Sequence, residues 1–188
     1  MTVRKVLRSG RPLLRQHTRP VQSTEWDSGH LHRLVEDMIE TMREEDGVGL
    51  AAPQVQAGLR LFVYEITPNP RYPDLETEQP PRVLINPRIT KRSASMVHEW
   101  EGCLSFPDLR ARVPRHESVK VVAKDRDGEQ ISIPASGFEA RVIQHELDHL
   151  DGRHLLDRVQ DPETIMFSDE YQRFHNQMHG DSSSEPSS

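Results

Sequence analysis

The chain of 188 residues contains one cysteine, no long apolar run and no excess of basic residues. One cysteine cannot form an intrachain disulfide, and it is typical of a reducing compartment. No apolar run approaches the roughly 20 residues that cross a bilayer, and the N-terminus lacks the apolar block of a secretory signal. We therefore expect a cytoplasmic protein without a membrane partner.

The charge balance gives no support for a nucleic-acid binder. The formal net charge is −6, whereas such proteins usually show a basic excess or a basic stripe, so we expect no DNA partner. Residues 1–24 are an exception, with six Lys and Arg residues and no acidic residue. This composition is typical of an organellar transit peptide, which leaves an organellar location as the alternative. The other interpretation is a basic arm of the folded domain.

Apolar spacing predicts two helices separated by several strands. The first helix spans about 26–45 and stops at Asp46 and Gly47, and the second spans 137–150. Residues 47–54 are rich in small side chains and indicate a shaped loop. A short strand at 83–85 should be halted by Asn86 and Pro87. The other strands are expected at 61–66, 118–124 and 129–134, the last two joined by a turn at 125–128.

This order of elements predicts an α+β fold in one domain, residues 1–179, because strands gather between two helices without regular alternation. Residues 67–81 contain five prolines and should form a surface insertion loop. Residues 180–188 are mostly Ser with acidic residues, so we expect a disordered tail.

The second helix carries the pattern H-E-x-x-H. Residues four apart lie on one helix face, so His145 and His149 can point at one metal ion. Glu146 projects beside them and can act as acid and base toward a water molecule. The competing interpretation is two surface histidines on a charged helix. If a metal is bound, the pattern indicates a hydrolase.

A third ligand is needed, and ligand chemistry alone leaves several candidates. A zincin-type metalloprotease would use a downstream glutamate, and Glu163 and Glu170 are available. The metzincin pattern would need a histidine where Leu155 stands, since His154 comes one residue early. Cys103 is the remaining candidate, in a loop-like segment after a strand, and a thiolate with two imidazoles suits Fe²⁺, Zn²⁺, Co²⁺ or Ni²⁺.

Three segments together resemble the signature motifs of the peptide deformylase family. They are G-V-G-L-A-A-P-Q at 47–54, E-G-C-L-S at 101–105 and Q-H-E-L-D-H at 144–149, in that order. Shorter similarities at 5–15, 85–87 and 137–141 extend the resemblance over about residues 3–160. The resemblance implies a deformylase-like fold, with antiparallel or mixed strands packed around a central helix that carries H-E-x-x-H. It also places the basic arm in the folded domain.

The resemblance implies removal of the N-formyl group from the starting methionine of nascent polypeptides, with release of formate. It makes Cys103 the third ligand of one Fe²⁺ per chain, which Zn²⁺, Ni²⁺ or Co²⁺ can replace. Glu146 would move the proton, while the Gln54 amide and the Leu104 backbone N–H would stabilise the oxyanion. Glu101 would orient the site through Arg141 or Gln144. Substrate contacts would come from Gly49 and, in an apolar methionine pocket, from Val48, Arg110, Phe138 and Val142.

The resemblance is incomplete at the C-terminus. Ribosome-binding members often carry a basic C-terminal helix, whereas the segment after Asp161 is acidic or neutral here. We therefore expect formylmethionyl nascent peptides as partners, with transient proximity to the ribosome and without direct docking through this segment.

Overall fold

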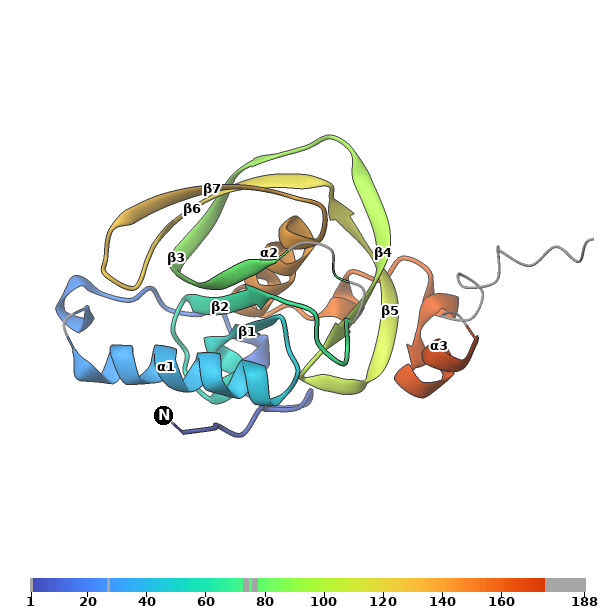
Figure 1. Cartoon of the computed structure of the whole chain (residues 1–188), viewed down its shortest axis with the longest axis horizontal. Coiled ribbons are helices and arrows are strands. Elements are labelled where there is room, and N and C mark those ends of the chain that lie inside the picture. Colours follow the sequence, from blue (N-terminus) through green and yellow to red (C-terminus); the bar gives the residue numbers. More distant parts are fainter. Residues whose placement is uncertain (1, 27, 73–74, 76–77, 175–188) are drawn as a thin grey trace, which may run out of the picture.

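A computed structural model describes residues 2–26, 28–72, 75 and 78–174 of the chain. Two antiparallel sheets and three α-helices make up its body (Figure 1). The expected tail at 180–188 lies outside the described residues, as does part of the proposed insertion at 67–81. Within the described part, no helix is both long enough and apolar enough to span a bilayer.

The larger sheet has five strands in the order β1-β2-β3-β6-β7, each antiparallel to its neighbour. Successive side chains of strand β2 point to opposite faces of the sheet. Both faces are covered, so the strand is buried on each side. Leu61 and Val63 pack in the apolar cluster beside α1, while Phe62 and Tyr64 pack in the cluster beside α2. The strand bounds are Gly49–Ala51, Leu61–Ile66, Gln79–Arg92, Ser118–Lys124 and Gln130–Ser136.

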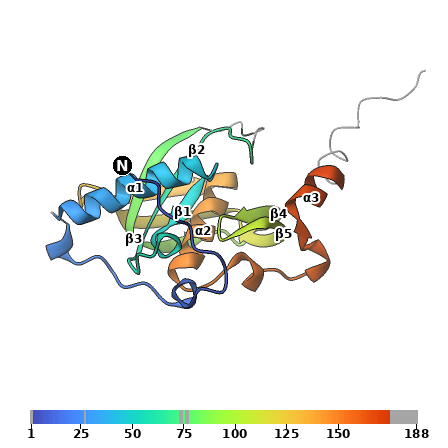
Figure 2. The same cartoon turned by 90° about the horizontal axis from the view of Figure 1, so that it is seen from below.

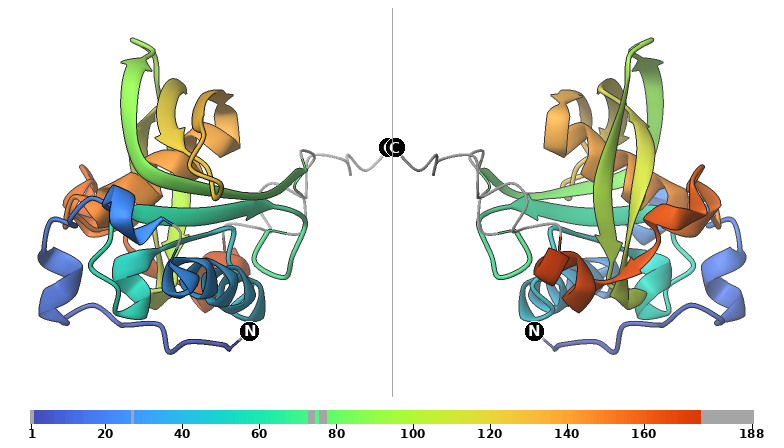
Figure 3. Two further views of the ribbon diagram at one scale, coloured as in Figure 1. Left: turned by 90° about the vertical axis from the view of Figure 1, so that its left-hand side faces the viewer. Right: turned by 90° about the vertical axis from the view of Figure 1, so that its right-hand side faces the viewer.

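The predicted short strand at 83–85 is wrong in length, since β3 runs through Asn86 and Pro87. Asn86 adopts a φ of 53°, and the register with β6 shifts between Ile85 and Arg88. A bulge of this kind tolerates Pro87, because a residue in a bulge does not have to donate a backbone N–H to the neighbouring strand. The first half of β3 pairs with β2 and the second half with β6, and Figure 3 shows the bend between them.

The smaller sheet consists of β4 (Met96–Cys103), β5 (Phe106–His116) and β8 (Met166–Phe167). We did not predict the long β4–β5 hairpin, because its charged residues hide the alternation. Cys103 is the last residue of β4 rather than part of a loop. Helix α3 (Ser168–Phe174) contacts β5 and β8 at one end of the molecule (Figure 2).

Both predicted helices are present. Helix α1 spans Gly29–Glu44, and the Ser28 hydroxyl accepts a hydrogen bond from the Leu31 N–H at its start. Helix α2 spans Gly137–Leu150 and is central, contacting β1, β2, β5, β6 and β7. Short 3-10 helices connect the larger elements at Pro12–Arg15, Ser23–Glu25, Ala52–Val55, Leu155–Asp157 and Pro162–Thr164.

The basic N-terminal arm packs on the domain. Leu7 and Leu14 are buried. The Leu7 N–H donates to the Gln54 carbonyl at 2.7 Å, and the Ser9 N–H donates to the Ser105 carbonyl at 2.9 Å. The arm therefore braces two segments that carry predicted site residues.

Candidate metal centre

Cys103, at the end of β4, meets His145 and His149 from α2. Their ligand atoms all lie within 4.8 Å of one another, and the three side chains are buried. The Cys103 Sγ is 3.2 Å from the His149 Nε2. One thiol and two imidazoles converging in a dry site form a donor set that suits a divalent transition metal. The chemistry of the residues present therefore fits a metal ion.

The glutamates of the zincin alternative lie elsewhere. Glu163 and Glu170 are exposed, and neither belongs to the Cys103 cluster among the described residues. His154 is close to His149, with ring centroids 5.9 Å apart, but its Nε2 contacts the Leu14 carbonyl oxygen at 3.1 Å. The structure thus brings together the predicted cysteine and histidines, and the zincin alternative has no support.

A buried chain of ionic hydrogen bonds holds His145. Its Nδ1 lies 3.0 Å from the Glu101 Oε2. Arg115 donates two hydrogen bonds of 2.9 Å to Glu101 and a third, of 2.5 Å, to Asp148. Burial opposes ionisation of Glu101, but the charge of Arg115 and the hydrogen bond with His145 hold the pKa of this carboxyl below its usual value. These ionic hydrogen bonds fix the imidazole ring so that the His145 Nε2 faces the site.

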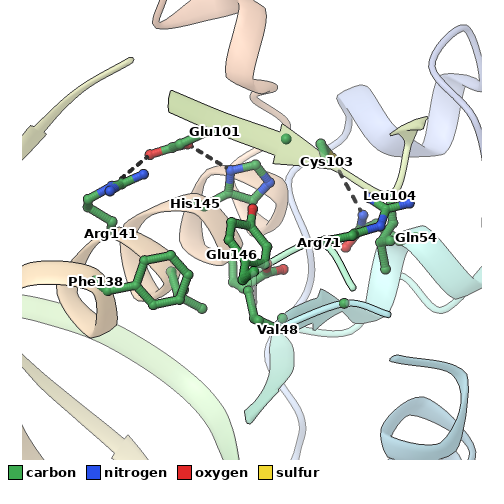
Figure 4. Close-up of a pocket in the computed structure, with 15 residues that line it drawn as sticks. Val48, Gln54, Arg71, Glu101, Cys103, Leu104, Phe138, Arg141, His145 and Glu146 are labelled. Carbon is green, nitrogen blue, oxygen red and sulfur yellow. Dashed lines mark hydrogen bonds and ion pairs between the residues drawn. The ribbon is translucent and has the colours of Figure 1, made fainter. Parts of the chain in front are cut away.

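Arg115 is the hydrogen-bonded cationic partner of Glu101, and Arg141, one of the two predicted partners, is also within ion-pair distance (Figure 4). The Arg141 Nε is 4.0 Å from Glu101, and its Nη2 donates to the Trp100 carbonyl at 2.6 Å. Gln144 instead bonds with the backbone of His116. Sequence reasoning missed Arg115 because its contact with Glu101 depends on the β4–β5 hairpin, which we did not predict.

His149 is held less completely than His145. Its Nδ1 is buried and has no hydrogen-bond partner among the described residues. Burial, together with the charge of His145, lowers the pKa of His149 well below its usual value. A neutral imidazole is the form that binds a metal, so this side chain is ready to act as a ligand.

Glu146 lies beside the cluster and against β1 (Figure 4). A Cβ atom added at Gly49 would lie only 2.4 Å from the Glu146 Oε1, so any larger residue here would displace the carboxylate. The Glu146 Oε2 is buried without a hydrogen-bond partner among the residues described. Burial raises the pKa of this carboxyl to about 7. The free oxygen and the raised pKa suit a group that exchanges a proton near neutral pH.

Gln54 is oriented within the 3-10 helix that carries it, Ala52–Val55. Its Oε1 accepts a hydrogen bond from the Ala51 N–H at 2.8 Å, which leaves the Nε2 as a donor. This nitrogen lies 3.1 Å from the Ser105 Oγ and 3.8 Å from the Cys103 Sγ (Figure 4). The amide donor therefore points toward the cysteine of the candidate metal centre.

A small cavity of about 50 Å³ opens onto these groups. Val48, Phe138 and Val142, which we proposed for a methionine pocket, are among the residues that line it. Arg110 does not line the cavity. Its guanidinium lies against Gly102 and its Nη1 is 3.2 Å from the Tyr72 hydroxyl. Glu101, Leu104 and Arg141, predicted in other roles, also line the cavity, and so do Arg71 and Tyr72, which we did not predict.

Comparisons with known proteins agree with this geometry. A family model described as polypeptide deformylase matches residues 3–164. Peptide deformylase 2 of Pseudomonas putida is 44% identical over 159 residues, 85% of this chain and 89% of that protein. Peptide deformylase 2 of Nostoc sp. is 40% identical over 167 residues, 89% of this chain and 92% of that protein.

Solved structures give the same result. A class I type b peptide deformylase from Acinetobacter baumannii, bound to Met-Ala-Ser, is 41% identical with a TM-score of 0.81. The match covers 84% of this chain and 99% of that one. A Thermotoga maritima structure is 36% identical with a TM-score of 0.75, over 86% and 100% of the two chains.

Proposed function

We propose that Cys103, His145 and His149 hold the catalytic metal ion of this protein. The chain belongs to the peptide deformylase family and removes the N-formyl group from nascent peptides. The observation that carries this proposal is the buried convergence of the three side chains beside Glu146. A bound divalent cation lowers the pKa of a water molecule and polarises a carbonyl oxygen. We propose Fe²⁺ as the resident ion, with Zn²⁺, Ni²⁺ or Co²⁺ able to replace it.

Glu146 is the proton carrier in this proposal. Its free Oε2 accepts a proton from the water that attacks the formyl carbon. The same carboxyl then donates that proton to the amine nitrogen as the carbon–nitrogen bond breaks, so formate and a free N-terminal amine leave. A positioned acid and base of this type contributes roughly 10²- to 10⁴-fold to a rate.

Gln54 and Leu104 supply the donors for the developing oxyanion. Leu104 directly follows Cys103 in the turn between β4 and β5, so its backbone N–H belongs to the segment that carries the thiol. The Gln54 Nε2 lies on the same side of the site. Each such donor is worth about 2.7–4 kcal/mol of barrier when it is preorganised in a dry site.

The methionine side chain occupies the apolar part of the cavity, against Val48, Phe138 and Val142. Gly49 lies beside Glu146, so a substrate whose formyl group reaches Glu146 would run along the Gly49 backbone, and the missing side chain leaves that backbone accessible. The Acinetobacter baumannii relative bound to Met-Ala-Ser supports a peptide with N-terminal methionine as the ligand. Arg110 acts on the pocket only indirectly, from behind Gly102.

We place this reaction in the cytoplasm, close to ribosomes, because its substrate is a nascent chain. The test is formate release from formyl-Met-Ala-Ser by protein purified without oxygen in Fe²⁺ or Ni²⁺. The loaded protein should release formate, and chelation of the metal should abolish that release. N-acetyl-Met-Ala-Ser, which adds one methyl group at the carbonyl, is the matched control and should be cleaved much more slowly. Metal-loaded protein that releases no formate would contradict the proposal.

A further inference from the structure

A second concave surface lies on the other side of α2. It has a volume of about 450 Å³ and is bordered by β3, β5 and the segment that follows α2. Helix α2 lines it with Gln144, Leu147 and Asp148, whereas Val142, His145 and Glu146 line the candidate catalytic cavity. The two sets point in different directions from the helix axis, so the groove and the cavity are separate.

The groove concentrates positive charge on a chain whose formal net charge is −6. Its charged lining side chains are six arginines and two aspartates. The aspartates already pair with the inner arginines, since Arg60 binds Asp151, and Arg115 and Arg158 bind Asp148. Among the described residues the outer arginines make no side-chain hydrogen bond or ion pair, and they are exposed: Arg88, Arg92 and Arg153.

We propose that this groove binds the phosphate backbone of RNA. A guanidinium donates two parallel hydrogen bonds to a phosphate, which makes arginine the side chain of choice for such contacts. The positive surface continues past Arg92 into a neighbouring depression that Lys91 and Lys120 line. Because basic groups extend beyond one small pocket, a polyanion fits this surface better than a single free phosphate.

The lining favours RNA backbone over other anionic partners. It contains no Phe, Tyr or Trp, and base-stacking sites depend on such aromatic platforms. Contacts to phosphate and sugar carry no sequence information, so we expect binding that does not depend on the RNA sequence. The surface is hollowed between strands, which suits a convex backbone and not a flat membrane.

This inference rests on the proposed function, because a nascent-chain enzyme works beside ribosomal RNA. It supplies a docking surface that is independent of the acidic or neutral C-terminal segment. Arg115 and Arg158 belong to the chain of ion pairs behind His145, so they are unsuitable as test positions. Arg88, Arg92 and Arg153 have no part in the catalytic site.

The test measures the binding of a fluorescent 20-base-pair RNA duplex by anisotropy over a range of salt concentrations. The metal-loaded chain is compared with an R88A/R92A/R153A variant. The matched control is K5A/R8A/R11A, which removes three positive charges from the N-terminal arm instead. We expect the groove variant to bind at least 10-fold more weakly. Its slope of log affinity against log salt should be smaller by about three, roughly one for each phosphate contact.

Three results would overturn the groove assignment. The wild-type chain could fail to bind the duplex, both triple variants could lose the same affinity, or anionic vesicles could bind as tightly as RNA. Formate release from formyl-Met-Ala-Ser is measured on the same samples and should be equal for wild type and groove variant. Lost RNA binding with intact formate release therefore bears on the groove alone, and absent formate release bears on the proposed function.

Discussion

The two faces of α2 treat their polar groups in opposite ways. On the face toward β5, Gln144 and Asp148 are fully engaged, with Gln144 bonded to His116 and Asp148 bonded to Arg115 and Arg158. On the face toward the cavity, Glu146 keeps a buried oxygen without a partner among the described residues. Both faces are buried, so exposure does not separate them.

This difference distinguishes side chains that hold a neighbour in place from a side chain that is free to react. A buried polar group without a partner costs about 1–3 kcal/mol of stability, so each one needs an explanation, and in the mechanism proposed above the attacking water is the partner of Glu146. A fully bonded group has no spare oxygen or proton for a reaction, but it can hold a neighbour in place. The comparison predicts rate effects on one face and effects on stability or metal affinity on the other.

The largest effect is expected for Glu146→Gln. The amide preserves shape but cannot carry the proton, so formate release should fall by roughly 10²- to 10⁴-fold. Bound metal, measured by elemental analysis, should stay at one per chain. The exposed Glu163→Gln is the charge-matched control and should retain full activity. A Glu146→Gln variant of normal rate would remove Glu146 from the mechanism.

Gly49→Ala should have the second-largest effect on the rate of formate release. The added methyl would lie 2.4 Å from the Glu146 Oε1, so the carboxylate must move by about 1 Å, and a displacement of this size can reduce a rate by about 10²-fold. Thermal stability should change little, because the group that yields is the end of a flexible side chain. At Gly58 the nearest atom to an added Cβ is 3.8 Å away, so Gly58→Ala is the control. Equal rates for both variants would contradict the close packing.

Glu101→Gln tests the chain of ion pairs behind His145. Loss of the carboxylate charge should weaken metal affinity by roughly 10- to 100-fold, as for other groups that orient a metal-binding histidine. Competition with a chelator provides the measurement. Glu99→Gln changes the same charge at an exposed position of β4 and should leave the affinity unchanged. If both variants bound metal alike, His145 would not depend on Glu101.

Gln144→Met should have the smallest effect of the four substitutions: it should lower stability and leave the rate of formate release unchanged. It removes two hydrogen bonds to the His116 backbone and one to the Ala140 carbonyl. We expect a loss of about 1–3 kcal/mol in the free energy of unfolding, measured by urea denaturation of metal-free protein. Gln160→Met is the exposed control. A large fall in formate release per folded molecule would break the proposed division between the two faces.

Residue spacing was sufficient for the elements whose signal is local. Both long helices, β2 and the β6–β7 hairpin follow from apolar periodicity and turn residues, which depend on near neighbours in the chain. The H-E-x-x-H pattern predicted two metal ligands and Glu146 for the same reason, because helix geometry fixes the directions in which residues four apart point. The family motifs then indicated Cys103 and Gln54.

Only the tertiary structure showed the contacts between side chains that lie far apart in the sequence. The β4–β5 hairpin brings the Arg115 guanidinium within hydrogen-bond distance of Glu101, 14 residues earlier in the chain, although their backbones are not paired. No local sequence pattern predicts that contact. The same hairpin packs the Arg110 guanidinium against Gly102, outside the lining of the cavity beside Glu146. Within the part of the chain that the structure describes, Glu146 has a free oxygen and the exposed arginines behind α2 have no side-chain partner. Both features likewise depend on which elements pack together, because a side chain's partners are set by the fold and not by its neighbours in sequence.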